Sequence, residues 1–199
     1  MKFAIFGGTF DPVHVGHLII AEQIYNNFSL DKVIFIPAKI PPHKNSSGIT
    51  PAYHRVEMIR LAIADNPHFT YSELELGLPG KSYTVETLKA LKKLGSEHSY
   101  SLILGADSLR DIFTWKQPYF ILKNAEIIVA RRPGIVLEEV FKDERLRPFR
   151  KDIKLLDNIL IDLSSSQIRE LLDRGQSIKY LIPEQVEDYI KDTTLYRGD

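Results

Sequence analysis

The sequence has no cysteine, a single tryptophan and two methionines among its 199 residues. Without cysteine, the chain can form neither disulfides nor thiolate metal sites. No apolar run approaches the roughly 20 residues that a membrane-spanning helix needs. The opening residues MKFAIFGG are too short for a signal peptide and lead directly into a motif described below. We therefore expect a cytoplasmic protein with no membrane partner.

The sequence also has no excess of charge of either sign. Lys plus Arg and Asp plus Glu number 26 each, so the formal net charge is zero. This balance argues against general nucleic-acid binding through a basic surface, but not against a local basic pocket for one phosphorylated ligand. Hydrophobic residues make up 44% of the chain, which is enough for a substantial core. We expect a single domain over residues 1–199.

Short apolar runs alternate with helical patterns along the chain. Strands are predicted at residues 2–6, 32–36, 69–73, 100–105, 125–134 and 158–163. Helices are predicted at 17–28, 51–65, 84–94, 164–175 and 183–191, with a further helical stretch between the fourth and fifth strands. This alternation is typical of an α/β fold, a Rossmann-like doubly wound parallel sheet with helices on both faces. Residues 164–199 would form a small C-terminal helical extension.

One segment between the first strand and the first helix concentrates unusual residues. It reads GGTFDPVHVGHL, from Gly7 to Leu18. Ligands of open parallel sheets bind beyond the carboxyl ends of the strands, glycine permits close approach, and a helix N-terminus favours a phosphate. His14 and His17 can face the same ligand, and Gly16 would leave the space beside them open. Helix caps and a zinc pair are the alternatives, although no third and fourth zinc ligands occur at the usual spacings.

Two common phosphate-binding motifs are absent from the sequence. After Gly8 the next glycine is Gly16, so the dinucleotide fingerprint G-x-G-x-x-G is missing, which disfavours a nicotinamide-dependent dehydrogenase. The fragment GLPGKS at Gly77–Ser82 looks like part of a P-loop, but Glu75 stands where that motif needs a glycine. The only long irregular stretch is Pro37–Pro51, and loops of that length are often functional.

The segment Gly7–Leu18 resembles the first signature of the nucleotidylyltransferase superfamily, whose H-x-G-H is His14–His17 here. The second signature of that superfamily, I-S-S-T-x-I-R, resembles LSSSQIR at Leu163–Arg169. Within the superfamily the chain is similar to the bacterial nicotinate-nucleotide adenylyltransferases. Further matching segments are Pro41–Lys44, Ser82–Thr84, Gly105–Leu109, Thr114–Lys116 and Arg131–Gly134. One departure is Lys116, at a position that is often Tyr in the family.

The resemblance implies that the adenylyl group of ATP is transferred to nicotinate mononucleotide, giving deamido-NAD and pyrophosphate. The attacking phosphate is already anionic, so no general base is required, and the protein must position two anions and neutralise charge. Mg²⁺ would act with ATP and be held mainly by its phosphates, with no separate metal site on the protein. ATP and nicotinate mononucleotide are thus the implied partners, and whether the chain forms a homo-oligomer is left open.

The resemblance also implies roles for individual residues. The histidines His14 and His17 would contact the ATP phosphates as the catalytic pair. The other implied ATP-site residues are Gly8, Thr9, Phe10, Gly105, Asp107, Ser165, Ser166 and Arg169. The mononucleotide would be bound by His43, Lys44, Thr84, Trp115 and Arg132. Each has a structural alternative: a helix cap for the hydroxyl groups and Asp107, a core position for Trp115, and solvation for the charged side chains.

Three other functions stay open at this stage. A phosphopantetheine adenylyltransferase typically has Thr at the position of His14, so that resemblance is weaker. A non-catalytic nucleotide sensor is disfavoured because both histidines and the second signature are present. An enzyme that accepts nicotinate and nicotinamide mononucleotides alike would differ only in a few pocket contacts.

Overall fold

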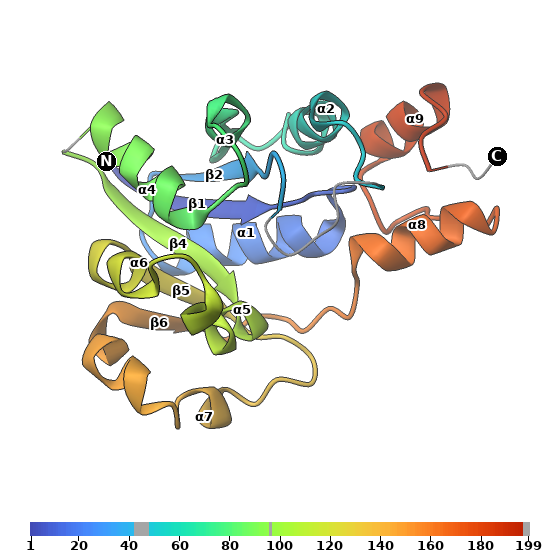
Figure 1. The fold of residues 1–199 in the computed structure, drawn as a ribbon. Coiled ribbons are helices and arrows are strands. Elements are labelled where there is room, and N and C mark those ends of the chain that lie inside the picture. The colour runs from blue at the N-terminus through green and yellow to red at the C-terminus, as the bar shows by residue number, and fades with distance from the viewer. Residues whose placement is uncertain (42–47, 96, 197–199) are drawn as a thin grey trace.

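The computed structural model describes residues 1–41, 48–95 and 97–196. Within these residues six strands form one sheet in the order β3-β2-β1-β4-β5-β6, and every neighbouring pair is parallel (Figure 1). The strands are β1 (Lys2–Gly8), β2 (Lys32–Pro37), β3 (Phe69–Tyr71), β4 (Ser99–Gly105), β5 (Glu126–Ala130) and β6 (Ile153–Leu156). The doubly wound parallel sheet predicted from the sequence is confirmed.

The helices of the described residues connect these strands and extend the C-terminal part. They are α1 (Val15–Asn27), α2 (Ala52–Ala62), α3 (Leu74–Gly77), α4 (Thr84–Leu94), α5 (Ala106–Arg110), α6 (Pro118–Asn124), α7 (Leu137–Val140), α8 (Ser165–Asp173) and α9 (Glu184–Asp192). Two 3₁₀ segments are η1 (Ile112–Thr114) and η2 (Glu144–Asp152). The short α3 and α7 were not predicted. None of the described helices is long and apolar enough to cross a membrane.

Alternate residues of the central strands point to opposite faces of the sheet and build two cores. On one face, Ala4 and Ile103 belong to a cluster with apolar residues of α1, α2, α8 and α9. On the other, Ile5 and Leu102 belong to a cluster with residues of α4, α5 and α6. Near-continuous apolar strands are expected when both faces of a parallel sheet are covered.

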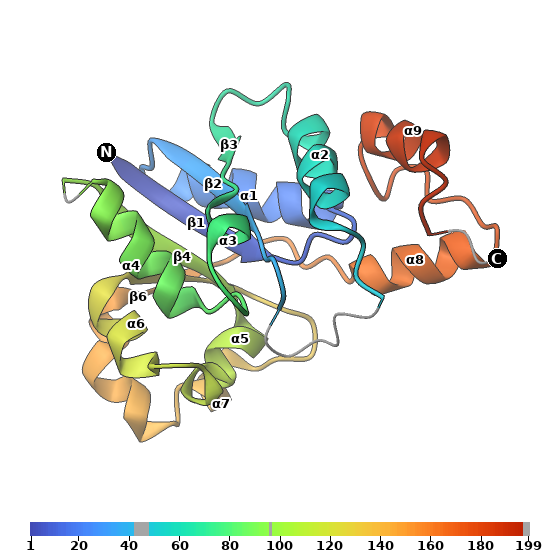
Figure 2. The same ribbon diagram turned by 45° about the horizontal axis from the view of Figure 1, so that its top comes forward.

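The C-terminal extension lies beyond the carboxyl end of β1 in both views of the ribbon (Figures 1 and 2). Its buried side chains Ile168, Ile182 and Val186 belong to the same core cluster as Ala4 of β1. The helix α8 begins at the N-cap Ser164, whose Oγ accepts from the Gln167 amide at 3.3 Å while Gln167 Oε1 accepts from the Ser164 amide at 2.7 Å. This confirms the capping box read from the sequence.

The sixth strand was predicted in the wrong place. The edge strand β6 is Ile153–Leu156, and residues 158–163 follow it without pairing to the sheet. In that segment Ile159 is 63% and Leu160 49% exposed, so the apolar run does not enter the core. The side chain of Asn158 is buried instead, and its Oδ1 accepts from the Arg131 amide at 2.6 Å. The strand β6 is only four residues long and Lys154 interrupts its apolar residues, so a search for apolar runs favoured the longer stretch that follows it.

Candidate active site

The order of the strands reverses between β1 and β4, and this is where open α/β sheets bind ligands. The carboxyl end of β1 is Gly8, where an added Cβ would lie 2.9 Å from the ring of Phe10. Phe10 has a left-handed backbone with φ of 51° and is 2% exposed. Its ring packs against His17 at a centroid distance of 5.0 Å and against Phe35 at 5.6 Å. The ring of Phe10, predicted to line the ATP site, therefore lies in the core beneath the loop.

The two signature histidines stack on each other at the start of α1. Their ring centroids are 3.7 Å apart and the ring planes differ by 28°. The Nδ1 of His17 accepts a hydrogen bond from the His14 amide at 3.2 Å, so a neutral His17 carries its proton on Nε2. An added Cβ on Gly16 would lie 3.0 Å from His14 Nδ1. The space that Gly16 was expected to leave open is thus filled by the His14 ring itself.

Both histidines are neutral at physiological pH. Burial, followed by the positive charge of Arg132, lowers the pKa of His14 to about 4. Burial is also the main cause that holds the pKa of His17 well below its ordinary value, with His14 and Arg132 contributing. The pair therefore offers N–H donors rather than cations, and the positive charge of the site has to come from arginine.

A second group of polar side chains meets at the carboxyl ends of β4 and β5. An added Cβ on Gly105 would overlap Asp107 Oδ1 and lie 2.9 Å from Arg132 Nε. Asp107 Oδ1 and Arg132 Nε are 3.7 Å apart, beyond hydrogen-bond distance. Among the described residues, the buried side-chain atoms without a hydrogen-bond partner are His14 Nδ1, Asp107 Oδ1 and Arg132 Nε. Such atoms cost about 1–3 kcal/mol each when left unpaired, so this cluster is suited to a polar ligand.

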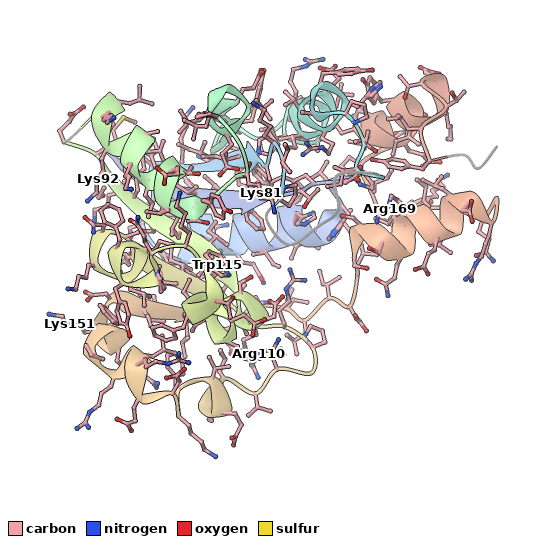
Figure 3. The ribbon with its side chains drawn as sticks, viewed as in Figure 1. Lys81, Lys92, Arg110, Trp115, Lys151 and Arg169 are labelled. Carbon is pink, nitrogen blue, oxygen red and sulfur yellow. The ribbon has the colours of Figure 1, made fainter. Side chains whose placement is uncertain are left out.

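The second signature contacts the first through two side chains. Ser165 Oγ donates to the Pro12 carbonyl at 2.8 Å, and Arg169 Nη1 donates to the Asp11 carbonyl at 2.6 Å. Arg169 Nη2 also donates to Ser166 Oγ at 3.3 Å. Arg169 comes from α8, whereas Trp115 comes from the segment after η1 (Figure 3). The two signatures, more than 140 residues apart, are therefore joined directly.

A cavity of about 500 Å³ lies between α5, the turn after β5 and the start of α8. Its lining includes Asp107, Arg132 and Ser166. Arg132 was assigned from the sequence to the mononucleotide, but the structure brings it to the side of the histidines and of Asp107. Its side chain lies with residues assigned to ATP.

Thr84 and Trp115, assigned to the mononucleotide, meet in a separate pocket of about 170 Å³, which Lys116 also lines. Both also line an adjoining cavity of about 110 Å³ that reaches Gly8, so this pocket opens toward the end of β1. Lys116 Nζ is 2.9 Å from Glu86 Oε1 and lies over the Tyr83 ring. His43 and Lys44 lie outside the described residues.

Four residues of this region were missed by sequence reasoning. Asp11 and Arg55 are 2% and 1% exposed beneath the first signature, and Tyr196 contacts Asp11. Glu75 is buried beside the small cavity, where it accepts from Thr87 Oγ1 at 2.6 Å and burial raises its pKa. Asp11 lies inside the motif and could have been found there, but nothing local marks Tyr196 or Glu75.

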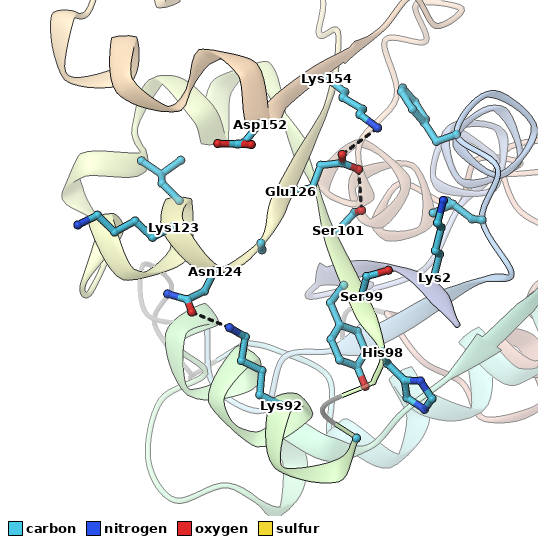
Figure 4. Close-up of a pocket in the computed structure, with 16 residues that line it drawn as sticks. Lys2, Lys92, His98, Ser99, Ser101, Lys123, Asn124, Glu126, Asp152 and Lys154 are labelled. Carbon is cyan, nitrogen blue, oxygen red and sulfur yellow. Dashed lines mark hydrogen bonds and ion pairs between the residues drawn. The ribbon is translucent and has the colours of Figure 1, made fainter.

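A larger hollow, about 640 Å³, lies at the opposite end of the strands, where the strands begin (Figure 4). Several of the polar side chains there pair with one another. Lys154 Nζ is 2.8 Å from Glu126 Oε1, Ser101 Oγ is 3.0 Å from Glu126 Oε2, and Lys92 Nζ is 2.6 Å from Asn124 Oδ1. The buried atoms that lack a hydrogen-bond partner lie at the carboxyl ends of the strands, which are therefore the candidate site.

Metal ligands are sparse in the part of the chain that the structure describes. No group of three or more His, Asp or Glu residues comes together there, so the stacked histidines have no third protein ligand among these residues. Nucleotidyltransferases generally use a divalent cation. The residues at this site fit a cation that arrives with the phosphates, because phosphate oxygens are ligands that Mg²⁺ accepts and arginine and histidine N–H groups bind phosphates directly.

The doubly wound sheet, the stacked histidines and the unpartnered polar atoms at its switch point define an α/β nucleotide-binding protein. A family model described as cytidylyltransferase-like matches residues 5–171. The chain belongs to the cytidylyltransferase-like family, in the branch of the nicotinate-nucleotide adenylyltransferases.

Three known proteins illustrate this relationship. A Desulfitobacterium hafniense protein described as a probable nicotinate-nucleotide adenylyltransferase is 43% identical and covers 98% of this chain and 96% of its own length. A Geobacter sulfurreducens protein of the same description is 40% identical over the full length of both chains. The solved Plasmodium falciparum nicotinic acid mononucleotide adenylyltransferase, complexed with NaAD, is 23% identical and superposes with a TM-score of 0.79 over 98% of this chain and 97% of that one. That likeness shows the same fold.

Proposed function

We propose that this protein transfers the adenylyl group of ATP to nicotinate mononucleotide, forming deamido-NAD and pyrophosphate. The observation that carries the proposal is the meeting of two unlike sites at one strand end. The stacked histidines with the unpartnered Asp107 and Arg132 atoms suit phosphates, and the Thr84–Trp115 pocket suits a flat ring. The cavity that reaches Gly8 joins that pocket to the end of β1.

In the proposed reaction an oxygen of the mononucleotide 5′-phosphate attacks the α-phosphorus of ATP. A new P–O bond forms, the bond between the α-phosphorus and the bridging oxygen breaks, and pyrophosphate leaves with the electron pair. The nucleophile is anionic, so no protein base takes a proton. Neutral His14 and His17 donate N–H groups to the phosphates, and Arg132 and Arg169 supply positive charge. Preorganised donors of this kind stabilise the charge that develops in the transition state.

Mg²⁺ bound to the ATP phosphates would neutralise part of the charge of the leaving pyrophosphate. The phosphates would supply most of its ligands.

Further residue roles belong to the same proposal. Gly8, Thr9, the backbone of Phe10, Gly105, Asp107, Ser165 and Ser166 would surround ATP, with Arg132 added to them. Thr84 and Trp115 would bind the pyridine ring, and His43 and Lys44 stay predictions. Residues 1–199 would work as one domain in the cytoplasm, a setting that also stays a prediction.

Incubation of the protein with ATP, Mg²⁺ and either a panel of mononucleotides or 4′-phosphopantetheine tests the proposal. We expect pyrophosphate release with nicotinate mononucleotide and deamido-NAD as the product identified by mass. Release with 4′-phosphopantetheine alone would instead support the rival adenylyltransferase. ATP binding without turnover of any acceptor would support a nucleotide sensor.

A further inference from the structure

The C-terminal end of the described chain returns to the first signature. Tyr196 follows α9 and has a left-handed backbone with φ of 63°. Its Oη donates to Asp11 Oδ1 at 2.6 Å, a contact between residues 185 positions apart. Asp11 lies between β1 and the histidine pair and its side chain is 3% exposed. Burial and the Asp11 charge raise the pKa of Tyr196, so its hydroxyl stays protonated and remains a donor.

Asp11 is also close to a guanidinium of the second signature. Arg169 Nη1 donates to the Asp11 carbonyl at 2.6 Å and lies 4.0 Å from Asp11 Oδ2. The Thr50 amide donates a hydrogen bond to Asp11 Oδ2 at 3.3 Å. Arg55, which is 1% exposed, donates to the carbonyls of Thr9 and Thr50. Within the described residues the Asp11 carboxylate accepts hydrogen bonds from the Tyr196 hydroxyl at 2.6 Å and the Thr50 amide at 3.3 Å, so the Tyr196 bond is the shorter of the two.

Removing the Tyr196 hydroxyl would leave Asp11 Oδ1 without that bond. Buried charges are stable only when they are paired and hydrogen-bonded. Among the described residues, Arg169 is the cation nearest to compensate, because its Nη1 stands 4.0 Å from Asp11 Oδ2 and its side chain is 32% exposed. A shift toward the carboxylate would take the guanidinium away from Ser166, whose side chain lines the cavity of about 500 Å³ together with Asp107 and Arg132.

We propose that Tyr196 is a positioning residue for ATP: by satisfying Asp11, it keeps Arg169 available to the triphosphate. The inference rests on the proposed function, since it assigns Arg169 to ATP. It adds Tyr196, at the end of the described residues, to the residues that support ATP binding. Tyr196 lies outside both signatures.

The variant Tyr196→Phe removes one oxygen and keeps the ring. We expect it to raise the KM for ATP by at least fivefold, with kcat and the KM for nicotinate mononucleotide within twofold of wild type. The matched control is Tyr189→Phe, whose Oη lies 2.8 Å from His54 Nδ1 and joins α9 to α2. It loses a similar bond away from Asp11, so its KM for ATP should not change. Equal effects of the two variants would overturn the proposal and indicate a merely structural role.

Two combined variants locate the effect. In an Arg169→Ala background, Tyr196→Phe should add no further rise in the KM for ATP. In an Asp11→Asn background it should also have no effect, because the neutral amide no longer attracts Arg169. Full additivity in either background would overturn the mechanism. Thermal melting checks that each variant is folded.

Equilibrium titration with Mg-ATP separates this inference from the proposed function. A weaker affinity in Tyr196→Phe supports the inference even if nicotinate mononucleotide proves not to be the acceptor. Equal affinities in the wild type and Tyr196→Phe would overturn the inference while turnover still supports the function. No ATP binding by the wild-type protein would overturn both.

Discussion

The two ends of the strands carry hollows of similar size and opposite character. The hollow at the amino ends, about 640 Å³, is the larger, and Lys154, Glu126 and Ser101 pair with one another there. The cavity of about 500 Å³ at the carboxyl ends borders the buried atoms Asp107 Oδ1 and Arg132 Nε, which stand 3.7 Å apart and have no hydrogen-bond partner among the described residues. Buried polar atoms left without a hydrogen bond are costly, so a cavity that borders several of them is suited to a polar ligand. Unsatisfied chemistry, rather than volume, marks the site.

The largest expected effect is the loss of turnover on His14→Ala, at the carboxyl ends of the strands. A positioned donor to the developing charge is worth about 10²–10³ in kcat. We expect a loss of that size in a folded protein, measured as pyrophosphate release. His68→Ala, which removes a histidine stacked on Tyr25 at 4.0 Å, is the control and should keep its turnover. Normal turnover of His14→Ala would remove the basis for placing the chemistry at the carboxyl ends of the strands.

Stability should depend on pH through the same histidine. The pKa of His14 is about 4 in the folded protein against 6.5 for an unperturbed histidine. The unfolded state therefore binds more protons between these values, and the free energy of unfolding falls as pH drops from 6.5 to 4. The His14 contribution amounts to roughly 3 kcal/mol, at 1.36 kcal/mol per pKa unit. Denaturant titrations should show a shallower fall for His14→Asn, and identical slopes would contradict the buried neutral state.

Gly105→Ala tests the close approach of Asp107 and Arg132. The added Cβ would overlap Asp107 Oδ1 and lie 2.9 Å from Arg132 Nε, both ends of side chains that can move. Displacing them should raise the KM for ATP roughly tenfold, or about 1.4 kcal/mol, with little change in melting temperature. The control is Gly77→Ala, where an added Cβ meets nothing within 4 Å. A large loss of stability with an unchanged KM would mean that Gly105 serves the fold instead.

The choice between acid and amide substrates tests the Thr84–Trp115 pocket, which opens toward the carboxyl end of β1. The carboxylate of nicotinate can accept from N–H donors and a hydroxyl such as that of Thr84, whereas the amide would leave a buried donor unpaired, at about 1–3 kcal/mol. We expect kcat/KM to be at least about tenfold higher for nicotinate mononucleotide. Trp115→Ala should raise the KM of both mononucleotides by a similar factor, because the indole can stack on either ring. Equal kcat/KM values for acid and amide would indicate a dual-specificity enzyme.

The sequence predicted the parts of the fold and site that local chemistry determines. The helix α4 was predicted at its observed bounds, Thr84–Leu94, and the Ser164–Gln167 capping box was read from its spacing. The three-residue spacing of His14 and His17 at a helix start predicted that both rings face one place, and the alternation of strands and helices predicted the parallel sheet.

The features that the sequence did not predict depend on long-range packing. The ring of Phe10 faces the core because its backbone is left-handed, which no neighbouring residue signals. Arg132 meets Asp107 only once β4 and β5 pair, and Gly105 leaves room for both. Asp11 and Tyr196 are joined across 185 positions by the docking of the C-terminal segment. Such contacts exist only in the assembled fold.

The smallest expected effect comes from a change at the amino ends of the strands. It tests most directly the comparison between the two hollows. Lys154→Ala removes the ion pair with Glu126, whose side chains are 45% and 37% exposed, so the free energy of unfolding should change by less than about 1 kcal/mol. Turnover and both KM values should stay within about twofold of wild type, since a tenfold change would need about 1.4 kcal/mol at a site that the pair does not touch. Steady-state kinetics beside a denaturant titration checks both expectations. A tenfold loss of kcat/KM in a stable Lys154→Ala protein would mean that the larger hollow takes part in function. Buried polar atoms without hydrogen bonds at the carboxyl ends of the strands would then no longer identify the site.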